Sequence, residues 1–233
     1  MKLLALDTAT EFCSAALWLD GQLRTREALA PRAHGELILP MIEQLLAEAA
    51  LGLDGLDAIA FGRGPGAFTG VRLAAAVAQG LGFAAQLPLI PVSDLRALAA
   101  QALAAPGAPD RAVICQDARM NEVYWGCFER SAQAIRAFGE EALAAPAALM
   151  LPSGWVAPGV PLLAAGSGFV AYPALRAQLG GASTTVVEGL YPRAQEIARL
   201  AADDGLACAV APEAALPVYL RDRVTAVAPP SRN

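Results

Sequence analysis

Histidine and the paired cysteines of metal sites are nearly absent from this chain of 233 residues. His34 is its single histidine, and Ile38 stands four residues later, so two histidines cannot share one helical turn as metal ligands. No C-x-x-C spacing occurs among the four cysteines, which are Cys13, Cys115, Cys127 and Cys208. The sequence therefore predicts no metal site, no cofactor and small, buried cysteines in a reducing compartment.

The residues of a hydrolase are also scarce. A Ser-His or Cys-His site would have to use His34 as its base. The Gly166-Ser167-Gly168 turn lacks the glycine two residues before the serine that a nucleophile elbow needs. We interpret His34 as a helix N-terminal or surface residue, and a peptidase is a disfavoured alternative.

Charge is low and slightly acidic. Lys and Arg total 17 against 22 Asp and Glu, which gives a net charge of −5. A broad phosphate-binding face is therefore not expected, and any nucleic acid is held mainly by another protein.

The chain also has little that targets it to a membrane. The apolar run before Asp7 is too short for a signal peptide, and prolines interrupt the uncharged stretch 142–175. These features predict a soluble cytoplasmic protein without a membrane partner.

Short apolar runs and helical patterns predict an α/β protein in which one order of elements occurs twice. In the first part we expect strands at 2–7, 13–19 and 22–28, a helix at 35–51, a strand at 58–62, a helix at 70–85, a strand at 89–92 and a helix opened by Ser93 or Asp94. In the second part we expect strands at 112–117, 122–129 and 134–139, a weaker helix, a strand at 162–165, a helix at 169–179, a strand at 184–187 and a helix at 194–202. The predicted domains are a βββαβαβα lobe at 1–105, a second lobe at 106–205 and a tail at 206–233 that packs back on them.

The segment from Gly64 to Arg72, with the sequence GPGAFTGVR, predicts a strand, a rigid turn and a helix start. Thr69 is a plausible N-cap. The turn could bind an anion through its N–H groups or be a tight connector. Because a cation is disfavoured in a first helical turn, Arg72 suggests an anionic partner nearby.

Two helices carry more apolar surface than one core requires. Apolar residues cover about 220° of the helix at 35–51, whereas covering a single core takes about 100°. Arg72 is the only charge in the helix at 70–86, where Gly70, Ala74 and Ala78 recur every fourth residue. We expect these helices to bury a face against a partner.

Three residues could line a cleft or bind a ligand there: Asp7, Thr10 and Arg119. Asp7 ends the first strand, where it could hold a metal-bound nucleotide or cap the turn that contains Thr10. The absence of glycine in that turn hinders close approach of phosphates. Arg119 lies in the segment 117–122, read as a hairpin turn that could face the cleft beside Tyr124 and Trp125.

Several of these segments together resemble the TsaB (YeaZ) family over nearly the whole chain. They are LALDTAT at 4–10, HGELILP at 34–40, GPGAFTGVR at 64–72, DARM at 117–120 with EVYW at 122–125, and PVYLRD at 217–222. The resemblance implies two tandem actin-like (ASKHA, ribonuclease H-like) lobes. It also implies a role in making threonylcarbamoyladenosine, the modified base next to the anticodon of tRNAs that read codons beginning with A.

The same resemblance implies partners. TsaB-like chains act as non-catalytic scaffolds that pair with the catalytic paralogue TsaD, whose metal-binding histidines this chain lacks. A TsaE ATPase joins, tRNA is reached through the complex, and a homodimer is possible in isolation. The implied interface comprises Leu37, Met41, Leu45, Phe68, Arg72, Ala74, Val77 and Ala78. Gly35 departs from the serine common after the histidine, which removes any role for that hydroxyl. A stand-alone nucleotide-dependent enzyme of the same fold remains an alternative.

Overall fold

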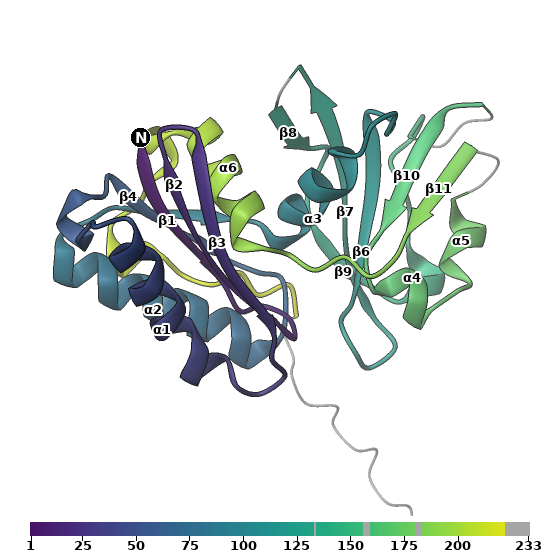
Figure 1. Ribbon diagram of the computed structural model, residues 1–233. Helices are drawn as coiled ribbons and strands as arrows, with labels where there is room; N and C mark the ends of the chain where they lie inside the picture. The colour runs from purple at the N-terminus through teal and green to yellow at the C-terminus, as the bar shows by residue number, and fades with distance from the viewer. Residues whose placement is uncertain (133, 156–158, 180–182, 222–233) are drawn as a thin grey trace, which may run out of the picture.

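The computed structural model describes residues 1–132, 134–155, 159–179 and 183–221, and it contains two β-sheets flanked by helices (Figure 1). Of the predicted tail at 206–233, residues 222–233 lie outside the described residues. The first sheet has the strand order β3-β2-β1-β4-β5. Its strands are β1 (Lys2–Asp7), β2 (Phe12–Leu19), β3 (Gln22–Leu29), β4 (Ala58–Gly62) and β5 (Leu89–Val92).

The second sheet repeats this order. Its strands run β11-β10-β6-β7-β8, so β6 takes the central place of β1, and β10 and β11 take the places of β4 and β5. The bounds are β6 (Arg111–Asp117), β7 (Val123–Ser131), β8 (Ala134–Ala137), β10 (Pro161–Ala165) and β11 (Ser183–Val187). In both sheets an antiparallel meander is followed by two parallel strands. The predicted duplication of topology is confirmed.

Helices cover the outer face of each sheet. On the first sheet α1 (His34–Glu48) and α2 (Phe68–Ala85) enclose a core with Leu4, Leu6 and Phe61. On the second sheet α4 (Gly168–Ala171) and α5 (Leu175–Gln178) lie over Val113 and Cys115. Of the described helices, α2 is long and apolar enough, by length and composition alone, to cross a membrane.

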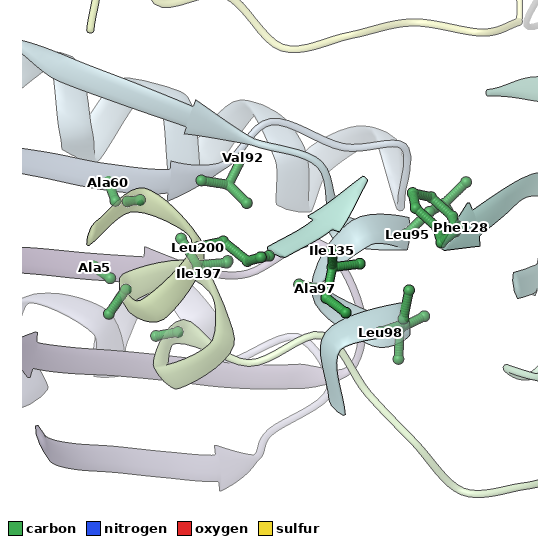
Figure 2. Packing of buried hydrophobic residues seen from close by; sticks show 14 of the residues in the cluster. Ala5, Ala60, Val92, Leu95, Ala97, Leu98, Phe128, Ile135, Ile197 and Leu200 are labelled. Carbon is green, nitrogen blue, oxygen red and sulfur yellow. The ribbon is translucent and has the colours of Figure 1, made fainter. Parts of the chain in front are cut away.

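The two inner helices are exchanged between the sheets. The helix that follows the first sheet, α3 (Asp94–Leu103), packs on β6 and β10 of the second sheet. The helix that follows the second sheet, α6 (Ala194–Asp204), packs on β1, β2 and β4 of the first. Both belong to one apolar cluster, in which Leu95 and Leu98 of α3 and Ile197 of α6 are buried between the sheets (Figure 2).

Part of the second lobe differs from the expected pattern. In place of the weaker helix the chain forms β9 (Ala142–Ala144), which pairs with β7, and a 3-10 turn at Pro146–Ala148. The helix expected at 169–179 is divided into α4 and α5, because Pro173 has no N–H to continue a helix. Further 3-10 turns lie at Leu53–Gly55, Leu206–Cys208 and Pro212–Ala214.

Candidate partner interface and lobe junction

The turn before α2 is a connector packed against the loop that follows β1. Ala67 N donates to Ala9 O at 2.8 Å, and Thr8 Oγ1 donates to Gly70 O at 2.7 Å. A side chain at Gly70 would place its Cβ 2.0 Å from Thr8 O. Loop and turn are therefore in direct contact, which favours the connector over an anion site. The predicted cap is wrong, because the N-cap position is Ala67, and Thr69 lies inside the helix.

Arg72 lies against two aromatic rings, and the anionic partner expected from the sequence stays a prediction. Its Nη1 donates to Phe68 O at 2.9 Å. Its guanidinium carbon lies 3.3 Å from the centroid of the Phe68 ring and 4.5 Å from that of Tyr219. Among the described residues Arg72 forms no ion pair, so the ring faces supply the negative potential that its charge attracts.

The predicted interface residues fall into two groups. Leu45, Ala74 and Ala78 are fully buried under α1 and α2, where they form part of the chain's own core. The others reach the surface: Phe68 is exposed, and Leu37, Met41, Arg72 and Val77 are half-buried. Their different placement reflects the helical period, which turns every third or fourth residue toward the sheet.

Two apolar side chains of α1 and α2 that were not among the predicted interface residues are also exposed. Leu39 on α1 is 45% exposed, and Phe83 on α2 is 77% exposed. Beside Phe83 lie two shallow depressions of about 420 and 520 Å³, which share Pro212 and Glu213 as lining residues. Exposure of most of a phenylalanine side chain to water is unfavourable, so this end of α2 is a candidate for contact with another surface.

Asp7 caps its own turn. The side chain is fully buried, and its Oδ1 accepts a hydrogen bond from Ala9 N at 2.9 Å. Thr10 Oγ1 accepts from Phe12 N at 3.2 Å and so closes the same loop. The capping interpretation is therefore confirmed, and neither side chain opens to a depression of the surface described above. Burial raises the pKa of Asp7 to about 6.

Asp94 was not predicted as a site residue, yet it faces Asp7 at the junction of the lobes. It is the first residue of α3 and is fully buried. Its Oδ2 accepts from Gly64 N at 2.5 Å. Burial and the charge of Asp7 raise the pKa of Asp94 well above its usual range. In the sequence it looked like an ordinary acidic residue in a first helical turn, which the helix dipole alone would explain.

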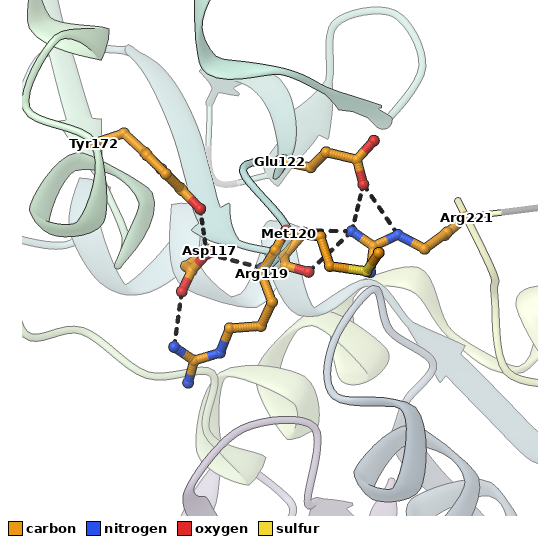
Figure 3. A network of polar contacts seen from close by, with 7 residues as sticks. Asp117, Arg119, Met120, Glu122, Tyr172 and Arg221 are labelled. Atoms are coloured by element: carbon orange, nitrogen blue, oxygen red, sulfur yellow. Dashed lines mark hydrogen bonds and ion pairs between the residues drawn. The ribbon is translucent and has the colours of Figure 1, made fainter. Parts of the chain in front are cut away.

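Arg119 lies in the hairpin between β6 and β7, as predicted. Its guanidinium forms an ion pair with Asp117 at 3.0 Å and is largely exposed. Tyr172 Oη donates to Asp117 Oδ1 at 3.1 Å (Figure 3). Tyr124 and Trp125 pack into different cores because successive side chains point to opposite faces of a strand, so they do not flank Arg119 together.

The C-terminal segment binds this hairpin through Arg221, a residue of the PVYLRD segment for which the sequence predicted no role. Arg221 donates to Ala118 O at 3.0 Å and pairs with Glu122 (Figure 3). Before reaching it, the segment runs along the first lobe, where Val218 N donates to Arg63 O at 2.7 Å. One segment thus joins both lobes.

The part of the chain that the structure describes was expected to lack a metal site and a hydrolase site. No three His, Cys, Asp or Glu residues there are placed to hold a metal ion. His34 begins α1, as expected, whereas Ser167 lies beside the second sheet and its Oγ accepts from Asp117 N. Cys13, Cys115 and Cys127 are buried and free, as predicted. The prediction of burial is wrong for Cys208, which is exposed in the 3-10 turn at Leu206–Cys208.

Known proteins place the chain in a family. A family model described as "TsaD: tRNA N6-adenosine threonylcarbamoyltransferase" matches residues 28–216. The "tRNA threonylcarbamoyladenosine biosynthesis protein TsaB" of Escherichia coli (strain K12) is 40% identical over 237 residues, which cover 96% of each chain. This chain belongs to the TsaB family. The TsaB protein of Haemophilus influenzae is 54% identical over 125 residues, about half of either chain.

Solved structures agree with the TsaB family assignment. "YeaZ from Pseudomonas aeruginosa" has 40% sequence identity and a TM-score of 0.84, and the match covers 94% of this chain and 99% of that one. A second Pseudomonas aeruginosa structure, described as "an uncharacterized protein with similarity to peptidase YEAZ", is 42% identical with the same TM-score. The two-lobed fold and the family resemblance predicted from the sequence are confirmed.

Proposed function

We propose that this chain takes part in making threonylcarbamoyladenosine in tRNA, as a non-catalytic subunit that pairs with a TsaD-like paralogue. The observation that carries the proposal is its similarity to Escherichia coli TsaB over 96% of both chains. The modified base lies beside the anticodon of tRNAs that read codons beginning with A. Catalysis belongs to the paralogue, and a TsaE-like ATPase completes the assembly.

The structure of the lobe junction supports the non-catalytic part of this proposal. A stand-alone enzyme of the actin-like fold would bind nucleotide phosphates against the loop after Asp7. Here Gly66 and Gly70 pack against Ala9 and Thr8, where even a Cβ would clash. Phosphate groups are larger than a methyl group, so they do not fit between these segments without separating them.

The apolar surface of α1 and α2 supports pairing. It combines the exposed Leu39, Phe68 and Phe83 with the half-buried Met41 and Val77. Burial of a large apolar side chain contributes about 1.5–3 kcal/mol, so covering these side chains would favour complex formation. The same surface would serve a homodimer when the paralogue is absent, since an exposed apolar face can bind its own copy.

The low charge supports an indirect route to tRNA. With a net charge of −5 the chain provides no broad positive face, so the paralogue would hold the nucleic acid. The proposed compartment is the cytoplasm, in keeping with three buried cysteines that remain unpaired.

The test combines a nucleoside measurement with a binding measurement. After depletion of the protein in its own organism, mass spectrometry of bulk tRNA nucleosides is expected to show loss of threonylcarbamoyladenosine. Wild type is expected to restore it, whereas Phe83→Glu combined with Leu39→Glu is not, because two charges would be buried without partners. Met150→Glu is the matched control, since Met150 is 80% exposed on the other lobe.

The two parts of the proposal fail separately. An unchanged nucleoside level after depletion would refute the role in tRNA modification. Restoration by the double variant, together with unaltered co-purification of the tagged TsaD-like paralogue, would refute the interface but leave that role intact.

A further inference from the structure

Two buried carboxyl groups face one another where the lobes meet. Asp7 ends β1, Asp94 begins α3, and neither is accessible to solvent. A Cβ added at Gly62 would lie 2.5 Å from Oδ1 of Asp7 and 2.5 Å from Oδ1 of Asp94. These two oxygens are therefore at most about 5 Å apart, and the missing side chain of Gly62 is what lets the carboxyl groups approach.

Each carboxyl group has one oxygen bonded to the backbone and one without a partner. Ala9 N donates to Asp7 Oδ1, and Gly64 N donates to Asp94 Oδ2. Asp7 Oδ2 and Asp94 Oδ1 are buried and have no hydrogen-bond partner among the described residues. Two ionised groups in this position would leave acceptors facing acceptors, which is costly in a dry interior.

The neighbouring cations are committed to other carboxylates. From the end of β4, Arg63 pairs with Glu141 at 3.2 Å, and Glu141 also accepts from the hydroxyl of Ser93. From α3, Arg96 binds both carboxylate oxygens of Asp204 on α6, at 2.6 and 2.9 Å.

The other titratable groups near the pair add no positive charge. Glu141 raises the pKa of Asp94 through its own negative charge. Cys13, on β2, is a buried thiol whose pKa is raised to about 11 by burial and the charge of Asp7. Within the described residues, no cation is therefore left to neutralise two negative charges at Asp7 and Asp94.

We propose that Asp7 and Asp94 share one proton at neutral pH, with the Asp94 carboxyl donating its O–H to the Asp7 carboxylate. This hydrogen bond gives the unpartnered Asp94 Oδ1 an acceptor in the Asp7 carboxylate and leaves a single negative charge. It ties the central strand of the first sheet to the helix that covers the second sheet. The junction of the lobes is thus a proton-binding site, independent of any role in tRNA modification.

The pKa directions agree with this geometry. Burial raises the pKa of Asp7 to about 6, and burial together with the charge of Asp7 raises the pKa of Asp94 further above its usual range. Because a raised pKa means that the folded state holds a proton the unfolded chain releases, stability falls as pH rises from about 4 through about 6, and it continues to fall until Asp94 releases the shared proton.

Carboxyl titration in the wild-type protein is the direct test. With aspartate labelled by carbon-13 at its carboxyl carbon, NMR is expected to show one aspartate that keeps the shift of a protonated acid at about pH 7, when ordinary aspartates are ionised. That signal should disappear in Asp94→Asn. If every aspartate has the ionised shift at this pH, the proposal is wrong, whatever the variants do.

Amide substitutions provide a second readout. In Asp94→Asn the amide oxygen can accept from Gly64 N while its NH₂ group donates to Asp7, so the melting temperature at neutral pH should equal or exceed that of wild type. Asp7→Asn likewise keeps a donor facing an acceptor. In the double variant two NH₂ groups face each other, so its melting temperature should fall below that of both single variants.

Two outcomes of these experiments would contradict the shared proton. A double variant more stable than either single variant would mean that both carboxyl groups are ionised and repel each other. A rise in the wild-type melting temperature with Mg²⁺ or Na⁺ that is lost in Asp94→Asn would mean that a cation, and not a proton, occupies the site.

Discussion

At the residue scale, glycines, which have no side chain, determine how closely the segments of the first lobe approach one another. Gly62 makes room for two carboxyl groups, and Gly70 lets the first turn of α2 rest on the backbone of Thr8. Gly80 lies in the same helix with nothing within 4 Å of an added Cβ. Gly70 and Gly80 therefore have different physical roles, although both interrupt an apolar sequence.

Alanine substitutions separate these roles. Gly70→Ala is expected to destabilise the chain by about 1–3 kcal/mol, because the new methyl group would overlap Thr8 O. Gly80→Ala is expected to stabilise it by about 0.5–1 kcal/mol, because alanine has the higher helix propensity and the site is open. Denaturant unfolding of the isolated chain measures both, and equal effects would contradict this account of the turn.

Sequence patterns predicted where the strands of the first lobe begin and end better than they predicted the contacts between segments. The strands at 2–7, 58–62 and 89–92 were correct, because short apolar runs ended by polar, glycine or proline residues indicate buried strands. The cap at Thr69 was wrong because contacts of Ala67 with the loop after β1 set where α2 begins. The partner of Arg72 was missed because Tyr219 is distant in sequence and adjacent only in the fold.

At the element scale, the C-terminal segment and the β6–β7 hairpin stabilise each other. Three consecutive residues of the hairpin have positive φ angles of 55–61°, namely Arg119, Met120 and Asn121. This backbone region is unfavourable for residues other than glycine. Arg221 binds the carbonyl oxygen of Ala118 and the carboxylate of Glu122 on either side of them. A guanidinium group that donates to two acceptors can hold a turn in a conformation that the residues of the turn disfavour.

Removal of the Arg221 side chain should loosen the hairpin. Arg221→Ala is expected to cost about 1–2 kcal/mol and to speed amide hydrogen exchange in residues 118–123. Arg221→Lys should recover part of this protection, since it keeps the charge but not the planar fork. Arg136→Ala is the control, because Arg136 is exposed and forms no ion pair within the described residues. Unchanged exchange in Arg221→Ala would show that the hairpin holds its shape unaided.

Also at the element scale, the breadth of the apolar face of a helix indicates how much apolar surface remains after one core is covered. The pattern of α1 and α2 predicted more apolar surface than one core uses, and the exposed Leu39 and Phe83 agree with that. The apolar pattern did not distinguish residues such as Leu45 and Ala74, which face the sheet, from residues that face outward. A helical wheel gives the angles between side chains around the helix axis, but it does not show which side of the helix faces the sheet.

At the scale of the whole molecule, the duplicated order of strands predicted two lobes, but not that they exchange helices. Each sheet has an inner face covered by a helix from the other half of the sequence, α6 on the first and α3 on the second. Bonds between Arg96 of α3 and Asp204 of α6 join the exchanged helices. The division of the chain into a lobe at 1–105 and a lobe at 106–205 stays a proposal. We expect the two segments to depend on each other for folding.

Fragments test this dependence. Residues 1–105 alone lack α6, so the inner face of β1, with Leu3 and Ala5, would be exposed to water. We expect this fragment to be aggregated or unfolded by circular dichroism, and the fragment 106–221 to behave likewise without α3. Co-expression should restore a soluble pair with cooperative melting, because each fragment supplies the helix that the other lacks. A monomeric 1–105 fragment that melts cooperatively by itself would mean that α6 is dispensable to the first sheet and that the exchange is not what unites the lobes.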